Sequence, residues 1–426
     1  MRLNITLANT AVGLLLLVCC ALPAAASDYT LSVFGNANED ETINMQDVTY
    51  TELIILEYRD ETELSDAKYD DKINMQDVTQ IELIILGKEK ELTLIDSADR
   101  VVTVNKPIER IITPYSGNIE TLRSLKATDI IVGIGSVSEP VFLDEFSDVP
   151  VIGSMWDPDV EAILNLDPDT VILHSRSTGT WGVALESAQD VLETAGVTVL
   201  RFNTNQADIY LKEVEKLGYI LGRREEAYEL ISFYNGIYDQ IDETVAEISE
   251  DDRPTVYFES SSPYSLSGAY AYIEETGGTN VFTEMDASID AEAVVSRNPD
   301  IILKGCWGSR GASGSTLLGG YGLDVDDTAA LKEVRDEIMS RPELENVEAV
   351  TNGQVYVMTS RVLCFMPGSG CRHFLQRAYQ AKWFHPELFE DLDPQAIHQE
   401  YLTEFQGLDI DLNEKGVFVY PSPDES

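Results

Sequence analysis

The sequence predicts an α/β protein of two Rossmann-like lobes bridged by a long helix, preceded by a small α-helical domain made from a duplicated loop–helix unit. Three observations predict this: a phrase repeated near the amino end, strand–helix alternation after residue 92, and one long amphipathic stretch dividing that alternation. We expect an export signal at residues 1–26, the repeat domain at 28–91, the lobes at 92–206 and 251–426, and the bridging helix at 207–250.

Charge is the outlying property of the composition. The 426 residues include 29 Lys+Arg against 75 Asp+Glu, a formal net charge of -46. Such a chain repels phosphates, so no nucleic acid is expected as a partner. Because the acids are spread among periodic apolar segments, we expect a folded protein in surroundings where cations screen self-repulsion.

The first 26 residues have the layout of an export signal. Arg2 is followed by an apolar core at 11–22 and small residues at 24–26. A stable membrane span needs about 20 apolar residues, so this core is short for one. Cys19 and Cys20 lack the small preceding residues of a lipoprotein site. We expect an exported, extracytoplasmic protein, secreted or at the cell surface; anchoring by an uncleaved signal is the alternative.

The phrase Ile-Asn-Met-Gln-Asp-Val-Thr occurs at residues 43–49 and again at 73–79, which is an internal repeat. Each copy ends a string of short oxygen-bearing side chains. Calcium takes roughly six to eight oxygen ligands, and a 12-residue loop with ligands at alternating positions supplies them. The predicted ligands, with Thr42 and Lys72 acting through carbonyls, are Asn36, Asn38, Asp40, Thr42, Asn44 and Asp47 in the first loop and Asp66, Asp70, Lys72, Asn74 and Asp77 in the second.

Both loops depart from the usual pattern. Position 6 is normally Gly for a positive φ, but here it is Glu41 and Asp71. Lys68 puts a cation where an oxygen ligand belongs, so the first loop should bind calcium better than the second. We expect Ile43 and Ile73 to pair the loops through a short β contact, and short helices at residues 48–56 and 78–86. An acidic repeat that holds no metal is the alternative.

Residues 34–90 resemble the type I dockerin module, a duplicated calcium loop–helix. The resemblance implies a possible cohesin-bearing partner that docks on the residues before each twelfth loop position: Met45, Gln46, Met75 and Gln76. Because the two pairs are identical, they would permit docking in two orientations related by a half-turn. A merely solvated surface is the alternative.

Apolar runs separated by helical periodicity follow residue 92, which indicates parallel sheets. After a hairpin at 94–104, the expected first-lobe strands are 110–113, 129–133, 170–173 and 197–202, with helices at 118–124, 160–166 and 182–195. A long amphipathic stretch at 206–248 is interrupted near Gly222. In the second lobe we expect strands at 255–259, 301–304 and 354–358 and helices at 291–296 and 328–340.

Residues 159–173 and 290–303 echo one another as a helix, a Pro-Asp turn and a buried strand. With phrases at 108–114, 352–357 and 383–389, this resembles the helical-backbone (class III) substrate-binding proteins for ferric siderophores, haem and cobalamin. The resemblance implies an ABC permease as partner and a ferric or cobalt chelate as cargo. It also implies that Glu161 and Glu292 engage permease arginines, the alternative being ordinary acids favoured at helix starts.

Parallel sheets bind ligands outside the carboxyl ends of their strands. Aromatic faces suit a bulky chelate, and arginine pairs with its carboxylates or phosphates. The candidate ligand residues are Tyr115, Ser116, Asn118, Trp156, Arg176, Trp181, Tyr264, Tyr270, Trp307, Arg310 and Arg361. For each aromatic residue, packing beneath a loop is the alternative.

Motifs of the common hydrolases and metal enzymes are missing from the sequence. The histidines form no HExxH pair, and there is no GxSxG elbow or CxxC spacing. We therefore expect a binding protein and no enzyme, with a dockerin-bearing surface scaffold or adhesion protein, or a polysaccharide-acting enzyme, as alternatives. In an oxidising compartment Cys364 and Cys371 could close a short disulfide loop, leaving Cys306 as a buried thiol.

Overall fold

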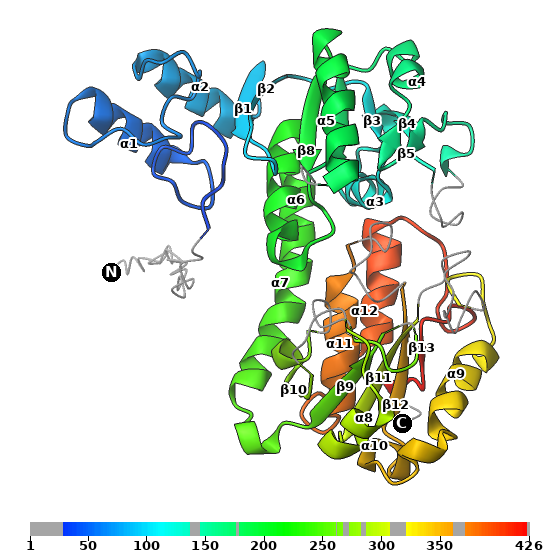
Figure 1. Cartoon of the computed structure of the whole chain (residues 1–426). Coiled ribbons are helices and arrows are strands. Elements are labelled where there is room, and N and C mark those ends of the chain that lie inside the picture. The colour runs from blue at the N-terminus through cyan, green and yellow to red at the C-terminus, as the bar shows by residue number, and fades with distance from the viewer. Residues whose placement is uncertain are drawn as a thin grey trace, which may run out of the picture.

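The computed structural model has two larger β-sheets, of four and five strands, one above the other, with the repeat domain at one side (Figure 1). Within the described residues, no helix combines the length and apolarity that a membrane span requires. The predicted export signal lies outside the described residues, which are 29–136, 145–175, 179–260, 262–266, 272–282, 287–306, 321–360 and 371–423.

The repeat domain contains two helices of almost equal length, α1 (Met45–Ile55) and α2 (Met75–Leu86). Each starts three residues earlier than predicted because the loop supplies a capping box. In α1, the Asn44 side chain accepts from a main-chain N–H of the first turn while Asp47 accepts from the Asn44 N–H; the second helix repeats this arrangement. Val48, Ile54, Val78, Ile81 and Ile84 form the buried face.

The repeat domain packs directly against the body of the protein. Val33 pairs with Leu94 of β1 (Glu91–Ile95), and Arg224 donates to the Ile85 carbonyl at 2.6 Å, close to the carboxyl end of α2. The predicted β contact between Ile43 and Ile73 is wrong. The N–H of Ile43 instead donates to the Tyr219 hydroxyl at 3.1 Å, because the first loop is covered by a body helix.

The first lobe is built on a four-stranded parallel sheet in the order β4-β3-β7-β8. A hairpin of β1 and β2 (Val101–Asn105) precedes it, as predicted. The sheet strands are β3 (Ile111–Thr113), β4 (Ile131–Ile134), β7 (Thr170–His174) and β8 (Thr198–Phe202). The lobe also contains α3 (Ser116–Ser124), a 3-10 turn (Thr128–Ile130), β5 (Gly153–Ser154), β6 (Asp157–Pro158), α4 (Val160–Asn165) and α5 (Gly179–Thr194).

The amphipathic stretch forms two helices, α6 (Ala207–Leu221) and α7 (Arg224–Ala246). Gly222 separates them at φ 66°, a left-handed conformation that glycine adopts without penalty. Of these two helices, α7 runs from one lobe to the other (Figure 1). Its 23 residues span about 35 Å at 1.5 Å per residue.

The second lobe has a five-stranded sheet in the order β10-β9-β11-β12-β13, parallel except for the edge strand β13. Its strands are β9 (Thr255–Glu259), β10 (Thr279–Asn280), β11 (Ile301–Cys306), β12 (Val355–Thr359) and β13 (Val419–Tyr420). Its α-helices are α8 (Ala291–Arg297), α9 (Ala329–Met339), α10 (Glu348–Thr351), α11 (His373–Phe384) and α12 (Pro394–Glu400). Short 3-10 turns occupy Glu250–Asp252, Glu274–Thr276 and Pro342–Leu344, and a π-helical turn, Tyr401–Phe405, follows α12.

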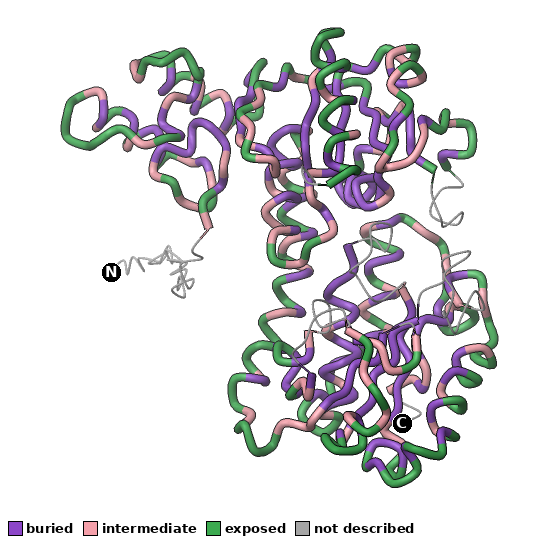
Figure 2. The backbone as a smooth tube through the Cα atoms, in the orientation of Figure 1, coloured by how far each residue is buried: buried purple, intermediate pink, exposed green. Residues whose placement is uncertain are grey.

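The lobes also meet along a buried seam between α3 and the helices after residue 371 (Figure 2). Glu120 accepts a hydrogen bond from the Tyr401 hydroxyl at 2.8 Å and pairs with Arg372 at 3.3 Å. The Cys371 sulfur donates to the Thr204 carbonyl at 2.7 Å, so Cys371 is present as a thiol; Cys364 lies outside the described residues. The lobes are therefore joined by the seam as well as by α7.

Candidate ligand-binding site

Four rings lie together at the carboxyl edge of the first-lobe sheet. Tyr115 follows β3, and His174 is the last residue of β7. The centroids of these two rings are 5.6 Å apart. Trp156 lies 5.1 Å from His174 and 6.2 Å from Trp181, near the start of α5. We call Tyr115, Trp156, His174 and Trp181 the ring cluster. Tyr115 is buried, Trp156 is half-buried and Trp181 is 48% exposed, so the cluster opens toward solvent at one end.

Trp156 is presented by the tight turn between β5 and β6. Gly153 holds this turn at φ 92°, and a Cβ there would come 2.6 Å from the Asp157 carbonyl oxygen. Only glycine fits both constraints. The turn thus places Trp156 over the His174 ring by local backbone geometry.

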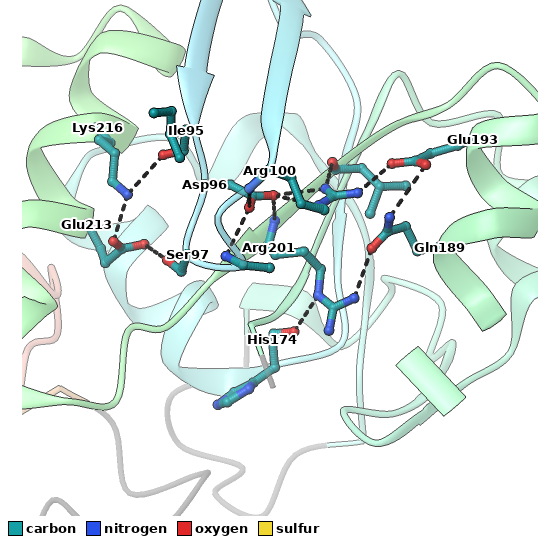
Figure 3. Close-up of polar contacts among 12 residues, drawn as sticks. Ile95, Asp96, Ser97, Arg100, His174, Gln189, Glu193, Arg201, Glu213 and Lys216 are labelled. Atoms are coloured by element: carbon teal, nitrogen blue, oxygen red, sulfur yellow. Dashed lines mark hydrogen bonds and ion pairs between the residues drawn. The ribbon is translucent and has the colours of Figure 1, made fainter. Parts of the chain in front are cut away.

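His174 is held at both its main chain and its ring. Arg201 of β8 donates from Nε to the His174 carbonyl at 2.7 Å (Figure 3). The ring Nε2 lies 3.1 Å from the Asn205 side-chain oxygen. Arg201 is itself buried, and burial followed by the charge of Arg100 lowers its pKa. Its guanidinium donates to the Gln189 side-chain oxygen at 2.9 Å. Its main-chain N–H donates to the Asp96 carboxylate at 3.1 Å, which connects the cluster to the β1–β2 hairpin.

Asn118 and Ser116 lie on α3, the helix that follows Tyr115. The Asn118 amide nitrogen donates to Thr113 at 3.0 Å and its oxygen accepts from Thr204 at 2.7 Å. Asn118 is 1% exposed, so it holds α3 to the sheet and does not reach the surface. Ser116 is half-buried at the first position of the helix.

Tyr264 is the described ligand candidate of the second lobe. Its hydroxyl donates to Glu343 at 2.8 Å, and the Arg341 guanidinium lies 4.9 Å from its ring centroid. Its main-chain N–H donates to Glu259 at the carboxyl end of β9. Tyr264 is therefore half-buried beside a set of charges, with its ring at the edge of the second-lobe core.

That set is a buried ionic cluster that sequence reasoning missed. Glu259 pairs with Lys304 at 2.8 Å and with Arg341 at 2.6 Å, and these side chains are almost wholly buried. Burial alone would raise the pKa of Glu259, but the hydrogen bonds and charges of Arg341 and Lys304 outweigh it and lower the pKa. A lysine near the end of an otherwise apolar strand was the available signal.

Several predicted residues fall outside the described ranges. They are Arg176, Tyr270, Trp307, Arg310 and Arg361. The described residues thus show the first-lobe wall of the predicted site, together with Tyr264 from the second lobe.

The two echoed segments have the same local construction. Asp159 and Asp290 cap α4 and α8, and both helices carry an exposed glutamate at the second position, Glu161 and Glu292. After each helix, an aspartate of the Pro-Asp turn accepts from the start of the neighbouring strand: Asp169 from Arg110 at 3.0 Å, and Asp300 from Thr255 at 2.7 Å.

The residue that precedes the proline of each turn has a matching backbone conformation in the two lobes. Asp167 and Asn298, each two positions before the turn aspartate, adopt φ 48° and 45°. The predicted permease-docking glutamates therefore occupy equivalent exposed positions in the two lobes.

The two repeat loops share one hydrogen-bond pattern. The wholly buried Asp47 accepts from the N–H groups of Asn38 at 3.1 Å and Asn44 at 2.8 Å. Asp77 accepts from Lys68 at 3.0 Å and Asn74 at 2.8 Å. Burial, as the largest cause, raises the pKa of both carboxyls.

The loops fit a cation only in part. Asn36 at loop position 1 is buried, and its side-chain oxygen has no hydrogen-bond partner among the described residues. Within the same residues, however, no three His, Cys, Asp or Glu side chains are gathered as a metal site would require. At position 6, Asp71 has the positive φ (61°) usual for that position, whereas Glu41 does not; at position 4 both loops have a positive φ, 57° at Glu39 and 52° at Tyr69.

The fold and the echoed segments can be compared with known proteins. A sequence profile of the family described as "Periplasmic binding protein" matches residues 111–362, more than half of the chain. The chain belongs to the periplasmic binding protein family. The repeat domain lies outside the matched residues of this binding protein.

Individual relatives agree with the family. The chain is 27% identical over 224 residues to an uncharacterized ABC transporter substrate-binding lipoprotein of Bacillus subtilis, YvrC, covering 50% of this chain and 68% of that protein. It is 24% identical over 237 residues to a cobalamin-binding protein of Halobacterium salinarum, covering 52% and 61% respectively. It therefore spans about two thirds of the length of these relatives.

Among solved structures, the TroA-like periplasmic binding protein FepB of Veillonella parvula matches with a TM-score of 0.62 and 25% identity, over 77% of this chain and 98% of that one. These names describe binding proteins, in agreement with the prediction of a binding protein rather than an enzyme.

Proposed function

We propose that this binding protein is the extracytoplasmic component of an ABC importer, capturing a metal chelate and delivering it to the membrane permease. The chelate is a ferric siderophore, haem or cobalamin. The ring cluster carries the proposal: four aromatic or heteroaromatic rings at the carboxyl edge of a parallel sheet offer flat faces for a bulky ligand. Aromatic anchors of this kind commonly dominate binding energy.

Binding of defined chelates to the purified chain tests this proposal. We expect cyanocobalamin, haemin or a ferric tris-hydroxamate to bind saturably in isothermal titration calorimetry. Trp156→Ala should weaken that binding by about 30-fold or more, as for an aromatic hot spot. Trp383→Phe is the matched control, because Trp383 is buried and stacked on Tyr356 at 4.6 Å, away from the ring cluster. No saturable binding of any of the three, or turnover of a glycan, would contradict the proposal.

Delivery to the permease is assigned to Glu161 and Glu292. Their equivalent exposed positions on α4 and α8 support this, since paired charges at a docking rim orient partners and speed their encounter. In proteoliposomes carrying the cognate permease, the double reversal Glu161→Arg/Glu292→Arg should abolish stimulation of ATP hydrolysis while chelate affinity stays unchanged. Full stimulation of ATP hydrolysis by the double variant would contradict the assignment of Glu161 and Glu292 to permease docking.

For the repeat domain we propose calcium binding and docking to a cohesin-bearing protein. The repeated aspartate pattern supports a cation in the first loop, as does the Asn36 side-chain oxygen, which has no hydrogen-bond partner within the described ranges. Met45 and Met75 are 59% and 57% exposed, and Gln46 and Gln76 beside them are also exposed, as a docking surface requires.

Calcium titration of the full chain separates the two loops. Asp47→Asn should remove the tighter calcium-binding event and Asp77→Asn the weaker one. The second loop should bind more weakly because Lys68 places a positive charge where an oxygen ligand belongs. Retention of a cohesin partner in a pull-down should depend on calcium and be lost with a chelator. Absence of any calcium-dependent heat or docking would make the repeat a purely structural element.

A further inference from the structure

The break at Gly222 joins two helices that are held by different lobes, and helix α6 is held by the first. Lys216 of α6 donates to the Ile95 carbonyl of the β1–β2 hairpin at 3.4 Å and pairs with Glu213 at 2.8 Å (Figure 3). Glu213 in turn accepts from the Ser97 hydroxyl in the turn of that hairpin. Helix α6 is therefore fixed to the first-lobe side of the molecule.

Helix α7 is held by the second lobe. The Tyr234 hydroxyl donates to the Cys371 carbonyl at 2.6 Å, and the Tyr234 ring centroid lies 4.6 Å from that of Phe374 in α11. Further along α7, Asp242 pairs with Arg377, which is also on α11. Because α6 is held by one lobe and α7 by the other, the angle between these helices is coupled to the arrangement of the lobes.

The repeat domain contacts both sides of this break. Before it, the Tyr219 hydroxyl accepts from the Ile43 N–H at 3.1 Å and lies 3.4 Å from the Thr42 hydroxyl. After it, Arg224 donates to the Ile85 carbonyl at 2.6 Å. The Arg224 guanidinium also lies 5.2 Å from the Tyr219 ring centroid. The first loop and the second helix of the repeat domain therefore reach α6 and α7 respectively.

A third contact holds the last turn of α6. The last carbonyls of a helix lack partners within the helix. Here Lys106 donates to the Tyr219 carbonyl and to Glu89, which follows α2, and both of these charged side chains are buried. Tyr219 and Ile43 are only 5% and 4% exposed. The break is therefore fixed by buried, specific hydrogen bonds, and losing a partner of a buried polar group is costly.

We propose that the repeat domain is a strap across the break between α6 and α7: its contacts with Tyr219 and Arg224 set the angle between the two helices and thereby the arrangement of the lobes. A partner that binds the repeat domain more tightly in one lobe arrangement would favour that arrangement, and the coupling is reciprocal. This inference goes beyond the proposed function, because it concerns lobe geometry and holds whatever ligand the lobes enclose.

Two variants of the full chain remove the strap contacts, and each has a matched control. Arg224→Ala is compared with Arg223→Ala, because the side chain of Arg223 is 40% exposed and only 3.9 Å from Glu226. Tyr219→Phe is compared with Tyr228→Phe, since Tyr228 is 73% exposed on α7. Tyr219→Phe removes a single oxygen atom, so it keeps the test decisive if Arg224→Ala fails to fold.

The lobe arrangement is measured by double electron–electron resonance between spin labels on α5 and α8. The labels are attached to Val191→Cys and Val295→Cys, which replace exposed residues, with Cys19, Cys20 and Cys364 changed to serine; Cys306 and Cys371 are buried. A change of about 5° at the break would move the far end of α7 by about 3 Å. We expect a shift or broadening of about this size in Arg224→Ala and Tyr219→Phe, and wild-type distances in both controls. Wild-type distances in the two strap variants, even with a lowered melting temperature, would overturn the proposal.

Hydrogen–deuterium exchange of the same proteins measures whether the break itself is released. In Arg224→Ala and Tyr219→Phe, amides of residues 218–226 should exchange about five- to ten-fold faster, because local opening loses the stabilisation of one or two buried hydrogen bonds. The controls should match the wild type. Equal exchange at the break in strap variants and controls would show that the repeat domain does not hold it, and would overturn the proposal. Neither measurement requires a chelate, so both remain valid if the proposed function fails.

Discussion

The two lobes share a scaffold but differ at the edge where a ligand would lie. Their echoed segments have the same helix cap, the same left-handed turn residue and the same aspartate bond to the neighbouring strand. At the carboxyl edge, the first lobe places aromatic rings around His174, whereas the second buries Glu259 with Lys304 and Arg341. The two lobes can therefore share the same backbone construction while the side chains at the carboxyl edges of their sheets differ in chemistry.

The largest expected effect comes from breaking the ionic cluster of the second lobe. Arg341→Ala leaves Glu259 buried with half its counter-charge, which should lower the free energy of unfolding by about 3–5 kcal/mol. Urea denaturation measures this. Lys332→Ala, which replaces an exposed lysine on α9, the helix that precedes Arg341 in the chain, should change stability by less than about 0.5 kcal/mol. A loss for Arg341→Ala no greater than that of the control would show that the cluster is not structural.

The seam joining the lobes should respond to acid. His373 and His398 are wholly buried, and burial as the largest cause lowers their pKa to about 4 and about 3. The unfolded chain takes up these protons near the ordinary value of 6.5, so stability falls as pH drops from about 6.5 to 4. Each histidine should contribute roughly 3 kcal/mol to this loss.

His398→Phe isolates one of these contributions. Neither ring nitrogen of His398 has a hydrogen-bond partner in the described part of the chain, and the ring packs against Phe418 at 4.5 Å. The variant should match the wild type at pH 8 within about 1 kcal/mol and exceed it at pH 5. Parallel stability–pH curves for the two proteins would show that His398 is not held neutral.

A symmetric pair of substitutions sharpens the comparison of the scaffolds. Asp169→Ala and Asp300→Ala each remove a carboxylate that accepts two hydrogen bonds at the start of a neighbouring strand. Both should cost about 1–3 kcal/mol in thermal or urea unfolding, as expected for bonds to a charged acceptor. A large loss of stability at one site and none at the other would contradict this expectation. It would mean that the two segments are similar in sequence but do not contribute equally to stability.

The smallest effect on stability is expected at the exposed helix starts. Glu161→Arg and Glu292→Arg should each change the free energy of unfolding by less than about 1 kcal/mol, because an exposed acid gains little from the helix dipole. Thermal unfolding of the two single variants checks this. A larger loss at either position would indicate a structural role and weaken its assignment to permease docking.

Much of the scaffold could be predicted because apolar runs and turn residues act locally. Strand β9 and the break at Gly222 lie where the pattern placed them. Helix α11 was not predicted because its buried residues include His373, Gln376 and Gln380. These polar residues interrupt the helical spacing of apolar residues that a sequence pattern would show. The antiparallel edge strand β13 is too short to leave a pattern of its own.

The site was harder to predict because its bonds join distant positions. Arg341 reaches Glu259 across 82 residues, and no local spacing indicates such a pair. Motif spacing did not select His174, because the histidines of the chain form no metal-binding pair. The rule that selected Tyr115, proximity to a strand's carboxyl end, would have selected His174 as well. Asn118 was selected by that rule but turned inward, since rotamer and packing decide direction.

Native mass spectrometry of the protein purified from its source, with bound ligand retained, tests the central claim most directly. We predict an added mass that corresponds to a single iron or cobalt chelate, present in the wild type and in Trp383→Phe but lost from Trp156→Ala. A ligand-free wild type, or a bound metal-free glycan, would contradict the assignment of this chain to chelate capture.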